Sequence, residues 1–167
     1  MQVSSQIDSQ VIELAHFDLN NEAAYAVWRQ EKLLNYPNFT KDLLVVVNDL
    51  LALSADEHRA IYALLIKSNM CVYQASNPEQ MGKSTIKRFA AQFGYKNLDT
   101  NICADSDSIS SLQTKDAGRH AGYIPYSNRK ISWHTDGYYN RPENTIRGML
   151  LHCANSAPVG GENQYLD

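Results

Sequence analysis

Apolar residues recur with helical spacing in three segments of the first hundred positions. The first helix is predicted over residues 21–34, where asparagines that can cap a helix precede an apolar face. The second is predicted over residues 54–69, because Ser54 and Glu57 stand three residues apart as in a capping box. A third amphipathic helix is predicted between residues 78 and 94, with a glycine as its C-terminal stop.

Two short β-prone runs, residues 43–47 and 70–74, lie between these helices and predict strands. From residue 110 onward the helical pattern fades, and short extended runs alternate with turn residues. The first part of the chain is thus predicted to mix helices and strands, and the part after residue 110 to contain strands only. This order of elements predicts an α+β domain. Its β part is expected to be a sandwich or jelly roll and not a parallel βαβ sheet. The late runs comprise residues 111–114, 123–126, 131–138, 145–153 and 163–166.

Composition and charge describe an ordinary globular chain. Its 167 residues suit a single domain, and 44% hydrophobic with 20% charged residues is not typical of disorder. A net charge of -3 argues against a nucleic-acid or anionic-membrane surface, and no apolar stretch reaches the length of a membrane span. The first ten residues are polar and lack a signal-peptide pattern, so we expect a cytoplasmic location. The cysteines at 71, 103 and 153 lie far apart and indicate neither a disulfide framework nor a zinc site.

The pair His134-x-Asp136 is the strongest candidate for chemistry. In an extended strand, side chains at positions i and i+2 project from the same face, so both could reach a single metal ion. An imidazole and a carboxylate are two of the three ligands in the facial triad that holds non-haem Fe(II). Tyr138 would share that face and could enclose a substrate, with core packing as the alternative.

Several short motifs in a fixed order resemble the taurine dioxygenase (TauD/TfdA) superfamily over roughly residues 40–167. The segment Leu150–Cys153 is similar to the γ-butyrobetaine hydroxylase-like branch of that superfamily. In chain order, the motifs are Trp133-His134-Thr135-Asp136, Arg141-Pro142, Leu150-Leu151-His152-Cys153, Gly160-Gly161-Glu162-Asn163, and Asp167.

The resemblance implies a double-stranded β-helix (jelly roll) with N-terminal helices, in which residues 1–167 form one oxygenase-like domain and about 1–40 a helical lead-in. It also implies an Fe(II)- and 2-oxoglutarate-dependent dioxygenase that uses O₂ to hydroxylate a small organic substrate. His134 and Asp136 would be the iron ligands. Asn163 stands where many members have a threonine that contacts 2-oxoglutarate, and its amide can donate a hydrogen bond to a carboxylate.

The family also needs a distal histidine as the third iron ligand and an arginine for the far carboxylate of 2-oxoglutarate. Both normally lie further downstream, so we expect the chain to be the N-terminal part of a longer protein, or a truncation. Within the chain, His152 is the best substitute ligand, although a histidine packed in the core is the favoured interpretation. Arg141 and Arg147 could clamp a carboxylate, but solvated surface arginines are commoner. The other histidines, His16, His58 and His120, are expected on the surface or in loops.

Two other functions stay open beside the dioxygenase. One is a truncated, inactive oxygenase-like fragment that acts by association and forms homo-oligomers through open β edges. The other is a zinc-dependent hydrolase, which would need a further ligand and a general base and lacks an H-E-x-x-H signature. The substrate could be a small acid, an amino-acid derivative or a betaine.

Overall fold

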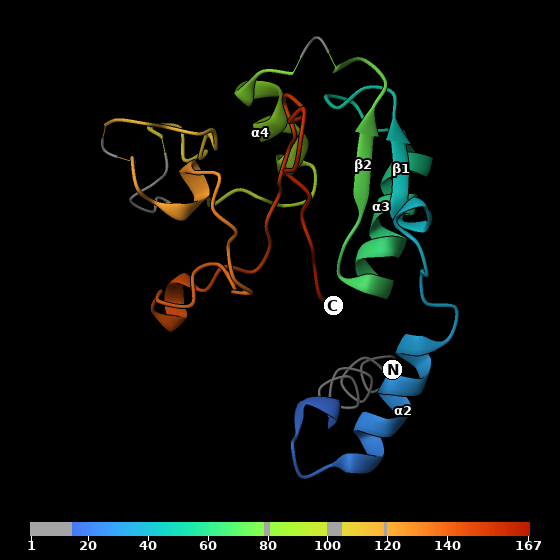
Figure 1. Cartoon of the computed structure of the whole chain (residues 1–167). Helices are drawn as coiled ribbons and strands as arrows, with labels where there is room; N and C mark the ends of the chain where they lie inside the picture. The colour runs from blue at the N-terminus through green and yellow to red at the C-terminus, as the bar shows by residue number, and fades with distance from the viewer. Residues whose placement is uncertain (1–14, 79–80, 100–104, 119) are drawn as a thin grey trace. The chain divides into compact units, whose positions relative to one another are not determined.

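The computed structural model describes residues 15–78, 81–99, 105–118 and 120–167. The chain divides into two compact units. Unit 1 comprises Met1–Asn77 and Glu162–Asp167, and unit 2 comprises Pro78–Gly161. Figure 1 shows the elements in chain order. The prediction of one domain stays a prediction.

The helical lead-in of unit 1 contains helix α2 (Glu22–Leu33), which follows the short 3-10 helix η1 (Ala15–Phe17). Asn21 caps α2, because its side-chain oxygen accepts a hydrogen bond of 3.1 Å from the backbone N–H three residues on. The helix predicted over residues 21–34 is confirmed.

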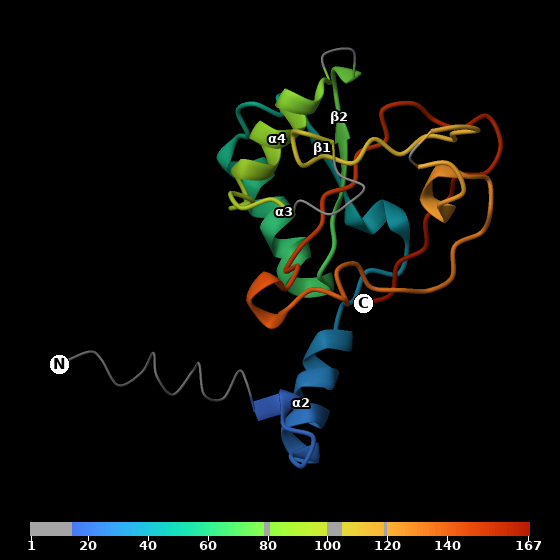
Figure 2. The same ribbon diagram turned by 90° about the vertical axis from the view of Figure 1, so that its left-hand side faces the viewer.

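A β-α-β segment makes up the rest of unit 1. Strand β1 (Leu44–Val47) follows the 3-10 helix η2 (Thr40–Leu43), and helix α3 (Ala55–Ser68) leads to strand β2 (Val72–Ala75). The strands pair in parallel, with each residue of β1 opposite the residue 28 positions later in β2. Figures 1 and 2 show α3 running alongside the two strands. The prediction that the chain holds no parallel βαβ sheet is therefore wrong for this unit. A helix between two strands returns the chain to the same end of the sheet, and this produces parallel pairing.

The ends of α3 are set by local side-chain chemistry. Ser54 accepts a hydrogen bond from the Glu57 N–H at 3.2 Å, and the Glu57 carboxylate accepts one from the Ser54 N–H at 2.7 Å. The predicted capping box is confirmed. At the other end, Asn69 adopts the left-handed conformation with φ 51° and stops the helix. The core of unit 1 contains buried Val47, Leu50 and Ile61.

Unit 2 begins with helix α4 (Lys83–Ala91), the third predicted helix. Its buried face carries Phe89 and Ala90, and the Phe89 ring packs edge-on against Phe93 at 5.3 Å. Gly94 follows with φ 87°, a conformation that favours glycine and ends helices. This prediction is confirmed, including the glycine stop.

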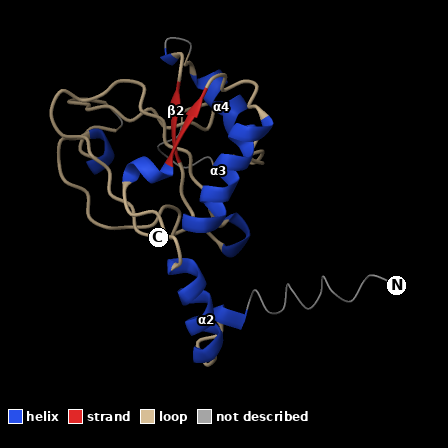
Figure 3. Cartoon of the chain, turned by 90° about the vertical axis from the view of Figure 1, so that its right-hand side faces the viewer, coloured by secondary structure: helices blue, strands red, loops and turns tan. Residues whose placement is uncertain are grey.

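The late strands predicted from the sequence are absent from the described residues. Figure 3 shows strands only in unit 1, and the described residues after α4 contain loops, turns and two 3-10 helices, η4 (Ile124–Tyr126) and η5 (Pro142–Asn144). The prediction of five late strands is wrong for these residues. A strand needs a hydrogen-bonded partner, so an alternating pattern alone cannot form one. In η4, Pro125 lacks an N–H and fixes φ, which favours a turn.

The fold class is α+β, as predicted, but the described residues do not show a double-stranded β-helix. None of the described helices is long and apolar enough to cross a membrane. The cytoplasmic location stays a prediction.

Candidate metal centre at His134 and Asp136

His134 and Asp136 lie in an irregular segment of unit 2 and not in a strand. A turn begins at Asp136, and the Asn140 N–H closes it by donating to the Gly137 carbonyl at 2.9 Å. The prediction that residues 131–138 form a strand is therefore wrong. Because this segment is not a strand, strand alternation cannot place Tyr138 on the same side as the candidate metal ligands.

The turn nevertheless brings the two predicted ligands together. His134 Nε2 lies 3.5 Å from Asp136 Oδ1. The two side chains are 45% and 51% exposed, so the pair is open to solvent. The juxtaposition that the H-x-D spacing suggested is present, although a loop and a turn produce it.

The contact of the other ring nitrogen, Nδ1, determines which nitrogen of the His134 imidazole carries the proton. His134 Nδ1 lies 2.8 Å from the backbone carbonyl oxygen of Ser132. A carbonyl oxygen only accepts hydrogen bonds, so Nδ1 must carry the proton and donate. In the neutral ring Nε2 then has a lone pair, and Nε2 lies 3.5 Å from an oxygen of the Asp136 carboxylate. Two acceptors at this separation repel each other unless a proton or a metal cation lies between them.

The spacing of the pair suits a shared metal ion. Two ligand atoms at about 2.1 Å from one metal lie about 3 to 3.5 Å apart, depending on the angle. A ligating histidine usually donates its second N–H to a carbonyl or carboxylate, and the Ser132 carbonyl provides that acceptor. Among the described residues, no group of three histidine, cysteine or acidic side chains could hold a metal. The pair therefore fits two positions of a metal centre and does not complete one.

Gly137 is a structural requirement of this turn. Its φ is 69°, and a Cβ at this position would lie 2.6 Å from Ile146 Cδ1. Backbone conformation and space therefore both favour glycine directly after Asp136. Sequence reasoning did not assign this role, although an Asp-Gly dipeptide is a turn signal that could have found it.

The remaining predicted site residues are distributed over both units. Tyr138 in unit 2 is 78% exposed, and its ring packs edge-on against Tyr139 at 5.2 Å. Asn163 belongs to unit 1. His152 is half-buried, and burial lowers its pKa, which favours the neutral ring. The structure thus brings His134 and Asp136 together, while the roles of Asn163 and Tyr138 stay predictions.

Asp167, the last residue of the matching motifs, has a role in unit 1 that sequence reasoning missed. Its carboxylate accepts hydrogen bonds from Asn69 Nδ2 at 2.6 Å and from the Tyr36 hydroxyl at 2.8 Å, and Lys32 Nζ lies at 3.1 Å. Desolvation raises the pKa of Asp167, but these three partners outweigh it and hold the pKa below its ordinary value of 3.8. Asp167 therefore connects the segment 162–167 to α2 and to the end of α3.

Comparison with known proteins identifies the family of the chain. Residues 31–167 match the family described as taurine catabolism dioxygenase TauD, TfdA family. Searches among curated proteins and among solved structures found no match. The matched range contains the pair His134 and Asp136 and the motifs on which the resemblance was based. The γ-butyrobetaine hydroxylase-like branch stays a prediction. The chain belongs to the TauD/TfdA family of dioxygenases.

Proposed function

We propose that the protein is an Fe(II)- and 2-oxoglutarate-dependent dioxygenase in which His134 and Asp136 bind the iron. The observation that carries the proposal is the orientation of His134. Its Nδ1 donates to the Ser132 carbonyl, so Nε2 presents a lone pair to the same space as Asp136 Oδ1, 3.5 Å away. Membership of a dioxygenase family supports iron over zinc for this pair.

The residues of the chain would bind and orient the metal, 2-oxoglutarate and the substrate, while the cofactors supply the oxidising chemistry. Fe(II) with 2-oxoglutarate and O₂ supplies the oxidation of a C–H bond in a small substrate when it is bound. His134 offers a neutral nitrogen held in one orientation by Ser132, and Asp136 offers a negative charge that balances part of the metal's charge. Asn163 is proposed to donate its amide hydrogen bond to a carboxylate of 2-oxoglutarate, and Tyr138 to contact the substrate.

The same proposal includes a fold and a branch of the family. We propose that the complete domain is a jelly roll and that the protein lies in the γ-butyrobetaine hydroxylase-like branch. The support for the branch is the Leu150–Cys153 segment. The support for the jelly roll is the family match alone.

Turnover of 2-oxoglutarate by the natural full-length protein tests the proposal. We expect consumption that requires both Fe(II) and O₂ and that His134→Ala abolishes. His58→Ala is the matched control, because it removes a histidine from α3 in unit 1. Undiminished consumption in His134→Ala would contradict the proposal, as would an equal loss in both variants.

A non-catalytic role by association is the second candidate function. It is favoured by the exposure of large apolar side chains beside the pair, with Trp133 at 68% and Tyr138 at 78%. This role predicts concentration-dependent self-association and no stoichiometric binding of Fe(II). A tight, stoichiometric iron site measured by metal titration would exclude it as the sole function.

A further inference from the structure

The turn that begins at Asp136 packs against the Ile146 side chain. A Cβ added to Gly137 would lie 2.6 Å from Ile146 Cδ1 and 2.7 Å from Ile146 Cγ1. Ile146 is half-buried, whereas residues 141–145 and 147–149 on either side of it are exposed or, at Gly148, open to solvent. Because Gly137 follows Asp136 directly, the position of Ile146 limits where the Asp136 backbone can lie.

Tyr95 contacts the same segment two residues beyond Ile146. A Cβ added to Gly148 would overlap the Tyr95 hydroxyl and would lie 3.1 Å from the ring carbon Cζ. The hydroxyl donates to the Met149 carbonyl at 3.5 Å, and burial raises the pKa of Tyr95, so the donating form is maintained. The Cα atoms of Ile146 and Gly148 are at most about 7 Å apart. Tyr95 therefore holds the segment close to the residue that supports the metal turn.

Glycine at 148 is required by this contact and not by the backbone. Gly148 is not among the glycines with a positive φ, so other residues could adopt its conformation. The Tyr95 ring occupies the space that a side chain at 148 would need. The two residues therefore form a matched pair, in which the absent side chain of one makes room for the ring of the other.

Tyr95 is itself held by the end of α4. Its N–H donates to the Ala90 carbonyl at 3.3 Å, and Gly94 turns the chain between them with φ 87°. Ala90 is buried, as is the preceding Phe89. The side chain of Tyr95 thus connects the buried face of α4 to residues 146–149.

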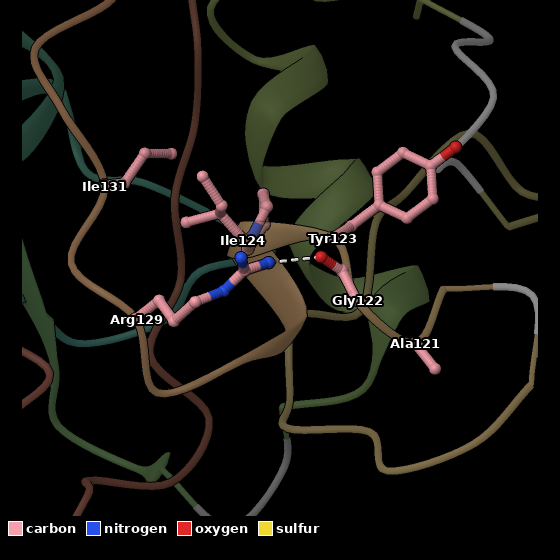
Figure 4. A pocket seen from close by; sticks show the side chains of 7 residues that line it. Ala121, Gly122, Tyr123, Ile124, Arg129 and Ile131 are labelled. Carbon is pink, nitrogen blue, oxygen red and sulfur yellow. Dashed lines mark hydrogen bonds between the residues drawn. The ribbon is translucent and has the colours of Figure 1, made fainter.

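The segment before the pair has local bonds of its own. Figure 4 shows the Arg129 side chain extending toward the Gly122 carbonyl, and the Ser127 hydroxyl donates to the Ile124 carbonyl at 2.9 Å. These bonds end five residues before His134. They constrain the turn at Asp136 less directly than the contact with the segment that Tyr95 holds.

We propose that Tyr95 positions Asp136 for the metal by holding the segment that carries Ile146. Tyr95 is a positioning residue and not a ligand, and its role rests on the proposed function of the His134 and Asp136 pair. A metal binds tightly when its ligands keep their separation before it arrives, because ordering them on binding costs free energy. Without the Tyr95 ring the turn can move, and Asp136 is less often within reach of an ion bound to His134.

Two measurements on variants of the natural full-length protein test the proposal. One is Fe(II) affinity by anaerobic titration, and the other is hydrogen exchange of the Asn140 amide, which closes the turn and needs no metal. Tyr95→Leu should weaken Fe(II) binding about 3- to 10-fold, less than the roughly 10- to 100-fold cost of losing a direct outer-shell partner of a ligand. The Asn140 amide should exchange faster, because the turn opens more often.

Gly148→Ala distinguishes the contact from a general loss of stability. Its methyl group would overlap the Tyr95 hydroxyl, so it should weaken Fe(II) binding as Tyr95→Leu does. In the Tyr95→Leu background the same methyl group should change the affinity less than about twofold, because substitutions that act through one contact are not additive. Phe93→Leu is the matched control, since it removes another ring near the end of α4, one that packs against Phe89. It should lower the melting temperature and leave the Fe(II) affinity and the Asn140 exchange unchanged.

Unchanged Fe(II) affinity in Tyr95→Leu would overturn the proposal, whether or not the Asn140 exchange changes. Equal losses in Phe93→Leu would also overturn it, because they would reflect the stability of unit 2 and not this contact. Fully additive effects of Tyr95→Leu and Gly148→Ala would contradict the shared contact. A wild type that binds no Fe(II) would refute the proposed function, and faster Asn140 exchange in Tyr95→Leu would then show that Tyr95 holds the turn without a role toward a metal.

Discussion

The two units of the chain position their residues by different means. In unit 1, the backbone hydrogen bonds of α2, α3 and the β1–β2 pair position the side chains, over a core that includes Val47 and Ile61. In unit 2, the described residues from 91 to 161 bury a single residue, Tyr126. Isolated backbone bonds within turns, together with side-chain bonds to the backbone, shape this segment. The candidate metal ligands His134 and Asp136 are in unit 2. Their placement therefore depends on single contacts and not on regular secondary structure.

Among the variants that test the difference between the two units, truncation of a buried residue should cause the largest loss of stability. Tyr126→Ala should lower the free energy of unfolding by about 3 to 5 kcal/mol, and Ile61→Ala by about 2 to 5 kcal/mol. Amide hydrogen exchange distinguishes the two variants. Tyr126→Ala should speed exchange at the Lys115 and Ser127 amides, which donate to carbonyls of η4, and Ile61→Ala should speed exchange in α3. Unchanged exchange at Lys115 in Tyr126→Ala would show that this residue is not the anchor of its region.

A smaller loss of stability is expected when Gly137, in the turn that begins at Asp136, is replaced by alanine. Gly137→Ala should cost about 1 to 3 kcal/mol, because it combines a left-handed φ with a contact of 2.6 Å to Ile146. Gly160→Ala is the matched control, since Gly160 has φ 75° and a Cβ added there would meet no atom within 4 Å. It should cost only about 1 kcal/mol. Thermal unfolding compares the two, and equal losses would mean that Ile146 moves aside freely and does not shape the turn.

The smallest loss of stability is expected when the charge of Asp167 in unit 1 is removed. Because the folded pKa of Asp167 lies below the ordinary value of 3.8, its carboxylate contributes stability above that pH. The contribution is lost as the pH falls through the lowered pKa. Asp167→Asn should therefore melt at a lower temperature than the wild type at pH 6, and the difference should disappear toward pH 2. A difference that persists at pH 2 would indicate that the charge of Asp167 is not responsible.

The elements that could be predicted are those whose determinants are close in sequence. The ends of α3 depend on Ser54, Glu57 and Asn69, which lie within or next to the helix, and a capping pattern reveals them. The H-x-D pair was found because imidazole and carboxylate are recognised by residue type alone. Strand pairing could not be predicted, because it depends on partners far apart in the chain.

The parts of the candidate site that were missed depend on backbone atoms or on contacts between distant residues. The acceptor that orients His134 is the carbonyl of Ser132, and every residue has a carbonyl. Part of the need for glycine at 137 arises from the contact with Ile146, nine residues later, which the Asp-Gly turn signal does not reveal.

Anaerobic titration of Fe(II) into the protein is the most direct test of the central claim, that His134 and Asp136 are ligands of one iron. We predict that His134→Ala and Asp136→Ala each weaken Fe(II) binding at least about tenfold, because the loss of an outer-shell partner of a ligand already costs about 10- to 100-fold. The control His58→Ala should leave the affinity unchanged. Equal Fe(II) affinity in the wild type, His134→Ala and Asp136→Ala would contradict the claim.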